Sequence, residues 1–199
     1  VPAQRNTAAG GIKLHLIWRE LAGYVGFAMG YIVYLTFLSA WMTDQQAPAL
    51  LISAVWIIMG VALIASPFVW RGVLARHASG KPLAMILTGI AIGSALPLVL
   101  PAGGAVVISA VVFGLCVFMA PGAITSFIRQ NLPAESWAAA MSLFTVVFAI
   151  AQTAGPFAAG ALGDLTGNIG SSLLAAAAIL LTGASVVAFQ KPLPQQDPG

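Results

Sequence analysis

Charged residues are scarce in this chain. Lysine, arginine, aspartate and glutamate make up 7% of its 199 residues, whereas 60% of the residues are hydrophobic. A soluble domain carries about 25% charged residues, so this chain has too few of them to cover a surface that faces water. The composition therefore excludes an ordinary soluble globular protein and indicates that lipid surrounds most of the chain.

Cysteine is nearly absent, and ionisable residues are absent from the middle of the apolar runs. The single cysteine, Cys116, excludes an intramolecular disulfide and a cysteine-based metal site. The basic residues are not interleaved with aromatic ones, so we expect no nucleic-acid partner, and we also expect no metal site and no cofactor. An intramembrane enzyme, such as a six-helix serine protease, is disfavoured because no histidine, aspartate or glutamate lies deep in a run to activate a nucleophile.

Six long apolar runs are present, and each is long enough to cross a bilayer. About 20 apolar residues span the hydrocarbon core as a helix, and none of the runs alternates like a β-barrel strand. The predicted fold is therefore an all-α membrane protein, with a six-helix transmembrane bundle over residues 16–190. The predicted spans are 21–42, 47–70, 82–100, 104–128, 136–162 and 168–189. We expect residues 1–15 to be a cytoplasmic linker and 191–199 a disordered cytoplasmic tail.

All eight lysine and arginine residues fall on one side of the membrane if the six runs are six crossings. They precede the first span, follow the sixth, or lie in the loops between spans two and three and spans four and five. The other three loops have none, and two of them carry Asp44 and Asp164. Because cytoplasmic loops retain lysine and arginine, this pattern predicts that both termini are cytoplasmic. It also favours contact between these loops and the lipid bilayer's anionic headgroups.

A weak internal repeat relates the second span to the fifth. The segments Gly72–Arg76 (GVLAR) and Gly160–Asp164 (GALGD) share the pattern Gly-x-Leu-small-charged. The charge pattern predicts that the segment after the second span lies on the cytoplasmic side and the segment after the fifth span on the opposite side. Two three-helix units of opposite orientation form an inverted repeat, so we expect the six spans to be two inverted three-helix repeats.

Together these features resemble one half of a major facilitator superfamily (MFS) transporter, and local motifs are similar to its C-terminal half. The segment Gly72–Lys81 (GVLARHASGK) resembles the superfamily's cytoplasmic loop G-x-L-a-D-R-x-G-R-R, in the form found between helices eight and nine. Residues 155–160 (GPFAAG) resemble the Gly-Pro-x-x-x-Gly pattern of helix eleven, and residues 24–37 are similar to the YbfB/YjiJ-like bacterial branch.

This resemblance implies a non-enzymatic secondary active carrier that moves a small-molecule substrate by alternating access in the bacterial inner membrane. It also implies a partner, the N-terminal six-helix half, which would precede the polar linker. A half-size carrier that acts as a homodimer is the alternative. If transport is coupled to protons, the resemblance places the membrane-buried carboxylate in the N-terminal half.

The cytoplasmic loop departs from the superfamily pattern at one position. Arg76 stands where the pattern has its acidic residue, so a salt-bridge gating role of that acidic residue is not expected here. We instead expect the loop to serve orientation and lipid contact, through the candidates Gly72, Arg76, Gly80 and Lys81.

Aromatic and amide side chains are the candidates for a substrate cavity. Three tyrosines of the first span follow the helical period, and a tyrosine combines a ring with a hydroxyl that can orient a substrate. The fifth span carries the most polar side chain near mid-membrane, an amide that must face protein or water. Helix packing is an equally open interpretation of each residue. The candidates are Tyr24, Tyr31, Tyr34, Thr145, Phe148 and Gln152.

Two proline-glycine pairs lie inside spans, Pro121-Gly122 in the fourth and Gly155-Pro156 in the fifth. Proline removes a helical hydrogen bond and kinks a helix. Transporters use interrupted helices to bend during alternating access, so these four residues are candidates for gating. A static kink is the alternative interpretation.

Overall fold

The computed structural model describes residues 14–100 and 103–194, and helices dominate this part of the chain. Six helices or helix pairs are long and apolar enough to cross a membrane, and no strand occurs among the described residues. The predicted all-α fold with six spans is therefore confirmed. The helices are α1 (Leu14–Asp44), α2 (Ala49–Arg76), α3 (Lys81–Val99), α4 (Gly103–Val117), α5 (Met119–Asn131), α6 (Ala134–Thr166) and α7 (Ile169–Ala188).

Several helices extend beyond the predicted spans. α1 begins at Leu14, inside the predicted linker, because its first turns pack against the bundle: Ile17 is buried, and the Gln190 side chain donates a 2.9 Å hydrogen bond to the carbonyl of Leu16. α6 continues to Thr166 and stops at Gly167, whose φ of 62° is the left-handed conformation that ends many helices. The rest of the predicted linker, residues 1–13, and tail residues 195–199 lie outside the described residues.

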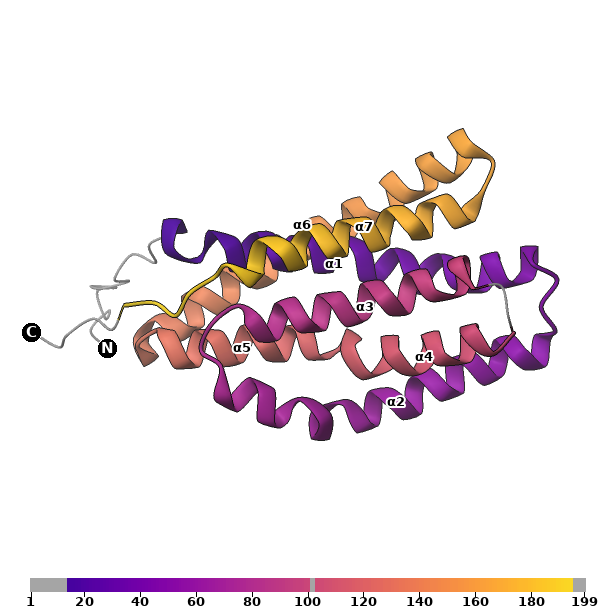
Figure 1. Cartoon of the computed structure of the whole chain (residues 1–199). Coiled ribbons are helices and arrows are strands. Elements are labelled where there is room, and N and C mark those ends of the chain that lie inside the picture. Colours follow the sequence, from indigo (N-terminus) through magenta and orange to yellow (C-terminus); the bar gives the residue numbers. More distant parts are fainter. Residues whose placement is uncertain (1–13, 101–102, 195–199) are drawn as a thin grey trace, which may run out of the picture.

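Helix packing follows the predicted inverted repeat of two units, α1–α3 and α4–α7. In this repeat α1 corresponds to the broken span α4–α5, α2 to α6, and α3 to α7. The α1–α7 contact is then matched by the α4–α3 contact, and the α1–α6 contact is matched by the α4–α2 contact. All four pairs are in contact, and α3 packs against α7, its own equivalent (Figure 1). Glycines allow close approach at two equivalent crossings, α6 over α1 and α4 over α2. A β-carbon at Gly155 would lie 2.6 Å from the carbonyl oxygen of Met29, and one at Gly114 would lie 2.6 Å from that of Met59.

Burial separates the helices into inner and outer ones. In α2 and α6 only 22% of the most apolar window is buried, compared with 44–56% in the other spans. Large apolar side chains are exposed along both helices, among them Phe68 and Phe157. Since a hydrophobic surface of this kind is not stable in water, α2 and α6 face lipid or another apolar partner.

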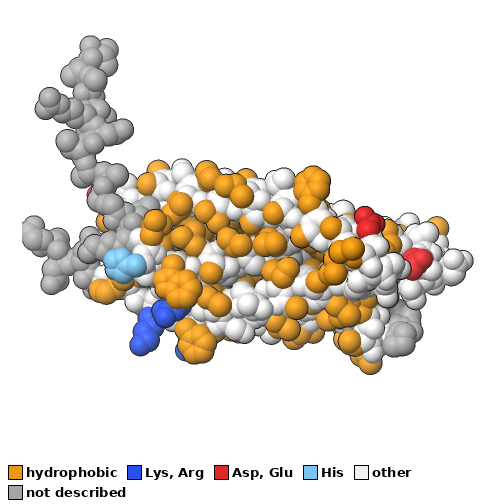
Figure 2. Space-filling model, turned by 90° about the horizontal axis from the view of Figure 1, so that it is seen from above, with side chains coloured by type: hydrophobic (Ala, Val, Ile, Leu, Met, Phe, Trp, Pro, Cys, Tyr) orange, Lys and Arg blue, Asp and Glu red, His pale blue; other side chains and the backbone are white. Residues whose placement is uncertain are grey.

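The two ends of the bundle differ in charge. Figure 2 shows the blue basic side chains at one end and red acidic ones at the other, with orange hydrophobic side chains between them. The helices run antiparallel, so the six described cations lie near the end that holds the start of α1 and the end of α7. Asp44 and Asp164 occur in the last turns of α1 and α6, at the opposite end.

Candidate functional site

The structure brings together Tyr31 and Gln152, two of the candidate cavity residues. The Tyr31 hydroxyl donates a hydrogen bond to the side-chain carbonyl of Gln152. Each residue lies two positions from the middle of its helix, Tyr31 in α1 and Gln152 in α6. The bond therefore joins the central helix to an outer helix near mid-membrane. Because it uses only the amide oxygen of Gln152, the amide nitrogen keeps its capacity to donate.

Aromatic rings surround this hydrogen bond. Tyr31 stacks on Phe27 with a centroid separation of 4.6 Å, and Phe148 of α6 lies 5.9 Å from Tyr31 and 5.4 Å from Tyr24. Phe144 makes an edge contact with Tyr24. We refer to Tyr24, Phe27, Tyr31, Phe148 and Gln152 as the α1–α6 cluster. It offers flat apolar walls next to one hydroxyl and one amide.

Two other cavity candidates lie apart from the cluster. Tyr34 is fully buried, stacks on Phe113 and hydrogen-bonds Ser109, which donates to the carbonyl of Gly93. These contacts join α1 to α4 and α3. Thr145 is exposed on α6, and its hydroxyl bonds the carbonyl of Met141 in its own helix. Tyr34 therefore bonds inside the bundle core, whereas Thr145 lies on the exposed surface of α6.

The helix is broken near one of the two candidate gating prolines and continuous through the other. Span four is interrupted at Phe118, between the end of α4 at Val117 and the start of α5. An N–H at position 121 would bond the carbonyl of Val117, and Pro121 has none, so the break lies where proline removes the helical bond. At Pro156, α6 continues without interruption. Gly122 follows Pro121, and Gly155 precedes Pro156. Gly155 lies against the backbone of Met29.

Of the four candidates in the segment 72–81, one is buried and three are exposed. Gly72, Arg76 and Lys81 are exposed. Gly80 is buried, and its N–H donates a 3.0 Å hydrogen bond to the carbonyl of Gln190, just beyond α7. The loop between α2 and α3 is thereby attached to the end of the last helix. Asn131 strengthens this attachment, since its amide donates to the carbonyl of Ala78 and its oxygen accepts from the N–H of Leu193.

Glu20 is a residue that sequence reasoning did not select. It is fully buried, and neither carboxylate oxygen has a hydrogen-bond partner among the described residues. Its neighbours include Gly80 from the loop, where a β-carbon would lie 2.9 Å from the carboxylate. In the sequence, Glu20 follows Arg19 at the start of an apolar run, as a charged residue at the membrane interface would. The sequence therefore gives no reason to expect that Glu20 is buried.

Comparison with known proteins agrees with this architecture. A family model described as "Uncharacterised MFS-type transporter YbfB" matches residues 3–188 of the chain. No curated protein and no solved structure matches. The family match spans all six candidate membrane helices and the α1–α6 cluster. This chain therefore belongs to the YbfB-like family of MFS-type transporters, which are multi-pass membrane proteins.

Proposed function

We propose that this chain is the C-terminal half of a secondary active carrier, which moves a small organic solute across the bacterial inner membrane by alternating access. The family match supports transport in general. The proposal adds that both termini are cytoplasmic, which is favoured by the basic residues at that end of the bundle. It also adds that the chain is a carrier and not an enzyme.

The observation that carries the proposal is the Tyr31–Gln152 hydrogen bond. A hydroxyl and an amide in the middle of a membrane are stable only with a partner, and here each is the partner of the other. A solute with a hydrogen-bonding group can exchange for one side of this bond. The rings of Tyr24, Phe27 and Phe148 would then contact its apolar part. We therefore expect the solute to combine an apolar or ring-shaped body with a hydrogen-bond acceptor for the Gln152 amide.

The exposed faces of α2 and α6 support a second six-helix half as the partner. These helices are the least buried spans of the described chain, and α6 also carries Gln152 and Phe148. A partner that covers α6 would enclose the α1–α6 cluster between the two halves. Rocking of the halves would then open the cluster to each side of the membrane alternately.

Solute binding by the full-length carrier tests the role of the cluster. A panel of small organic acids, amines and neutral solutes is first screened by thermal shift, and each solute that stabilises the protein is then followed by counterflow in proteoliposomes. Tyr31→Phe and Gln152→Ala should each raise the half-saturating solute concentration about 5- to 30-fold, as expected for the loss of one hydrogen bond of 1–2 kcal/mol.

Tyr34→Phe is the matched control, because it removes a tyrosine hydroxyl from the same helix whose partner is Ser109 in the core. It should leave the half-saturating concentration unchanged. Wild-type counterflow in both Tyr31→Phe and Gln152→Ala would remove the cluster from the substrate site.

The half-carrier interpretation has its own test. Proteoliposomes that contain only residues 1–199 should show no uptake of the solute identified above, and co-expression with an N-terminal six-helix half should restore it. Uptake by the chain alone, together with a crosslinked parallel dimer, would favour the homodimer alternative. Uptake by the monomeric chain would contradict the half-carrier proposal.

A further inference from the structure

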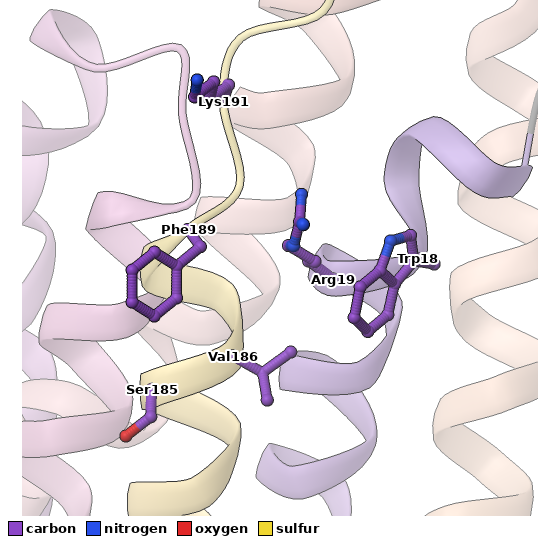
Figure 3. A pocket seen from close by; sticks show the side chains of 6 residues that line it. All are labelled: Trp18, Arg19, Ser185, Val186, Phe189 and Lys191. Carbon is purple, nitrogen blue, oxygen red and sulfur yellow. The ribbon is translucent and has the colours of Figure 1, made fainter.

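A groove opens between the start of α1 and the end of α7, and it shares no lining residue with the α1–α6 cluster. Its volume is about 580 Å³, and Figure 3 shows the side chains that line it. Two come from α1, two from the last turn of α7, and two from the residues that follow α7. They are Trp18, Arg19, Ser185, Val186, Phe189 and Lys191.

The groove carries two positive charges held on opposite walls. Arg19 comes from α1 and Lys191 from the segment that follows α7 (Figure 3). The guanidinium carbon of Arg19 lies 5.0 Å from the centre of the Trp18 ring. This cation–π contact restrains the guanidinium, whose planar set of N–H donors matches a phosphate. Lys191 adds a second, more flexible cation.

An exposed and mostly apolar surface leads out of the groove along α7. Leu181, Ser185 and Phe189 recur every four residues, so they lie on one face of the helix. The hydroxyl of Ser185 donates a hydrogen bond to the carbonyl of Leu181 within the helix. All three are exposed, and Phe189 is 72% exposed. On the α1 side, Trp18 is 48% exposed. Tryptophan prefers the headgroup level of a bilayer, which places the groove at the interface with the apolar face of α7 directed into the hydrocarbon.

The surrounding charge favours an anion at this level. The groove is at the end of the bundle that holds the six described lysines and arginines. Two described carboxylates, Glu20 and Glu135, are at this end, and Asp44 and Asp164 are at the other, so the cations are in excess near the groove. Basic pockets between transmembrane helices bind anionic lipid headgroups. A soluble anion would use the two cations only, but a phospholipid would use the cations and the apolar face together.

From this geometry we propose that the α1–α7 groove is a binding site for an anionic glycerophospholipid. Arg19 and Lys191 hold the headgroup phosphate, Trp18 and Phe189 flank the glycerol region, and an acyl chain follows the face of Leu181 and Ser185. The lipid then joins the first helix to the last one. Its binding is independent of the solute that the carrier moves.

Photo-crosslinking of the full-length protein in phosphatidylcholine vesicles tests the site. The probe is a trace of phosphatidylglycerol with a diazirine in its acyl chain, and labelled peptides are located by mass spectrometry. Because the acyl chain follows α7, we expect labelling of the peptide that contains Leu181 and Ser185. The double variant Arg19→Gln/Lys191→Gln should lower this labelling about 25-fold, since each cation near an anionic lipid contributes roughly a fivefold preference.

Arg71→Gln/Arg76→Gln is the matched control, since it removes two exposed cations from α2 at the same end of the bundle and should leave the labelling unchanged. The single variant Lys191→Gln removes one exposed cation and should lower the labelling about fivefold. It provides the test if the double variant does not fold. A diazirine phosphatidylcholine should label the groove weakly, and excess glycerol 3-phosphate should not compete.

Equal labelling by the two lipids, or an equal loss in the α2 control, would overturn the site in favour of diffuse surface attraction. Competition by glycerol 3-phosphate would assign the groove to a soluble phosphate compound instead. Full labelling of the Lys191→Gln and double variants would also overturn the proposal.

Discussion

Gly80 lies directly against Glu20, so that a β-carbon at position 80 would stand 2.9 Å from a carboxylate oxygen of Glu20. The same β-carbon would be 2.2 Å from the carbonyl oxygen of Val187 and 2.7 Å from the β-carbon of Gln190. Three distant segments meet here: the start of α1, the α2–α3 loop and the end of α7. The contact makes Gly80 the point at which the α2–α3 loop of the first repeat joins the last helix of the second.

Gly80→Ala should therefore destabilise the protein. The Val187 carbonyl is backbone and cannot rotate away, so the loop or the end of α7 must shift, at a cost of about 1–3 kcal/mol for overpacking. Gly72→Ala is the control in the same loop motif, since a β-carbon there would meet nothing within 4 Å. It should raise stability by about 0.5–1 kcal/mol, as alanine does in a helix. Thermal unfolding of the two variants in detergent measures the difference, and equal melting temperatures would contradict the contact.

Glu20→Gln should stabilise the folded protein. At neutral pH a glutamate that is buried without a partner must keep an unsolvated charge or take up a proton on folding, and either costs several kcal/mol. Glutamine has nearly the same shape and needs neither. We expect a gain of at least about 1 kcal/mol at neutral pH after the cost of the unpaired amide is subtracted. Glu135→Gln is the control, because Glu135 is exposed in the first turn of α6 and its neutralisation should lower stability slightly through the helix dipole. A melting temperature that falls sharply in Glu20→Gln would show that the carboxylate has a stabilising partner.

The number of spans was predictable because it depends on local composition. A run of 20 apolar residues is visible without any knowledge of its neighbours, and the charge difference between the ends of the bundle follows from the loops alone. The burial of Glu20 was not predictable, because its surroundings come from Gly80 and Gln190, which are distant in sequence. The start of α1 at Leu14 has the same origin, since its first turns are held by the end of α7.

The candidate site was predictable as a set of residue types but not as a set of contacts. Tyr31 and Tyr34 belong to the same periodic stripe, yet one bonds Gln152 of α6 and the other bonds Ser109 of α4. Helical period assigns both tyrosines to one broad face, and only the positions of α4 and α6 separate them. Thr145 and Gln152 are both on α6, yet Thr145 is exposed and bonds only within its own helix, whereas Gln152 bonds Tyr31.

Gly155→Ala should separate α6 from α1 and weaken the α1–α6 cluster. A β-carbon at position 155 would lie 2.6 Å from the carbonyl oxygen and 3.0 Å from the α-carbon of Met29, so two helix backbones must move apart. Gln152 lies one turn before this contact, and its bond to Tyr31 should lengthen. We expect a loss of about 1–3 kcal/mol in stability and weaker solute binding.

Gly160→Ala is the control for this substitution, because its β-carbon would only touch Phe37 at 4.0 Å. Hydrogen exchange of the amides around Gln152 should increase in Gly155→Ala and remain unchanged in Gly160→Ala. Unchanged exchange and solute affinity in both variants would mean that the crossing tolerates a methyl group and does not position the cluster.

Pro121→Ala should join α4 and α5 into one continuous helix and slow transport. The new N–H can bond the carbonyl of Val117, which adds about 1 kcal/mol of stability and should protect amides near Phe118 from hydrogen exchange. If span four bends there during alternating access, the straightened helix should lower the maximal counterflow rate while solute affinity stays close to wild type. Pro67→Ala is the control, since α2 is continuous through Pro67 and its replacement should leave the rate unchanged. A protected Phe118 region combined with a wild-type transport rate would make the break in span four a static kink, because a helix that works equally well unbroken does not need to bend there.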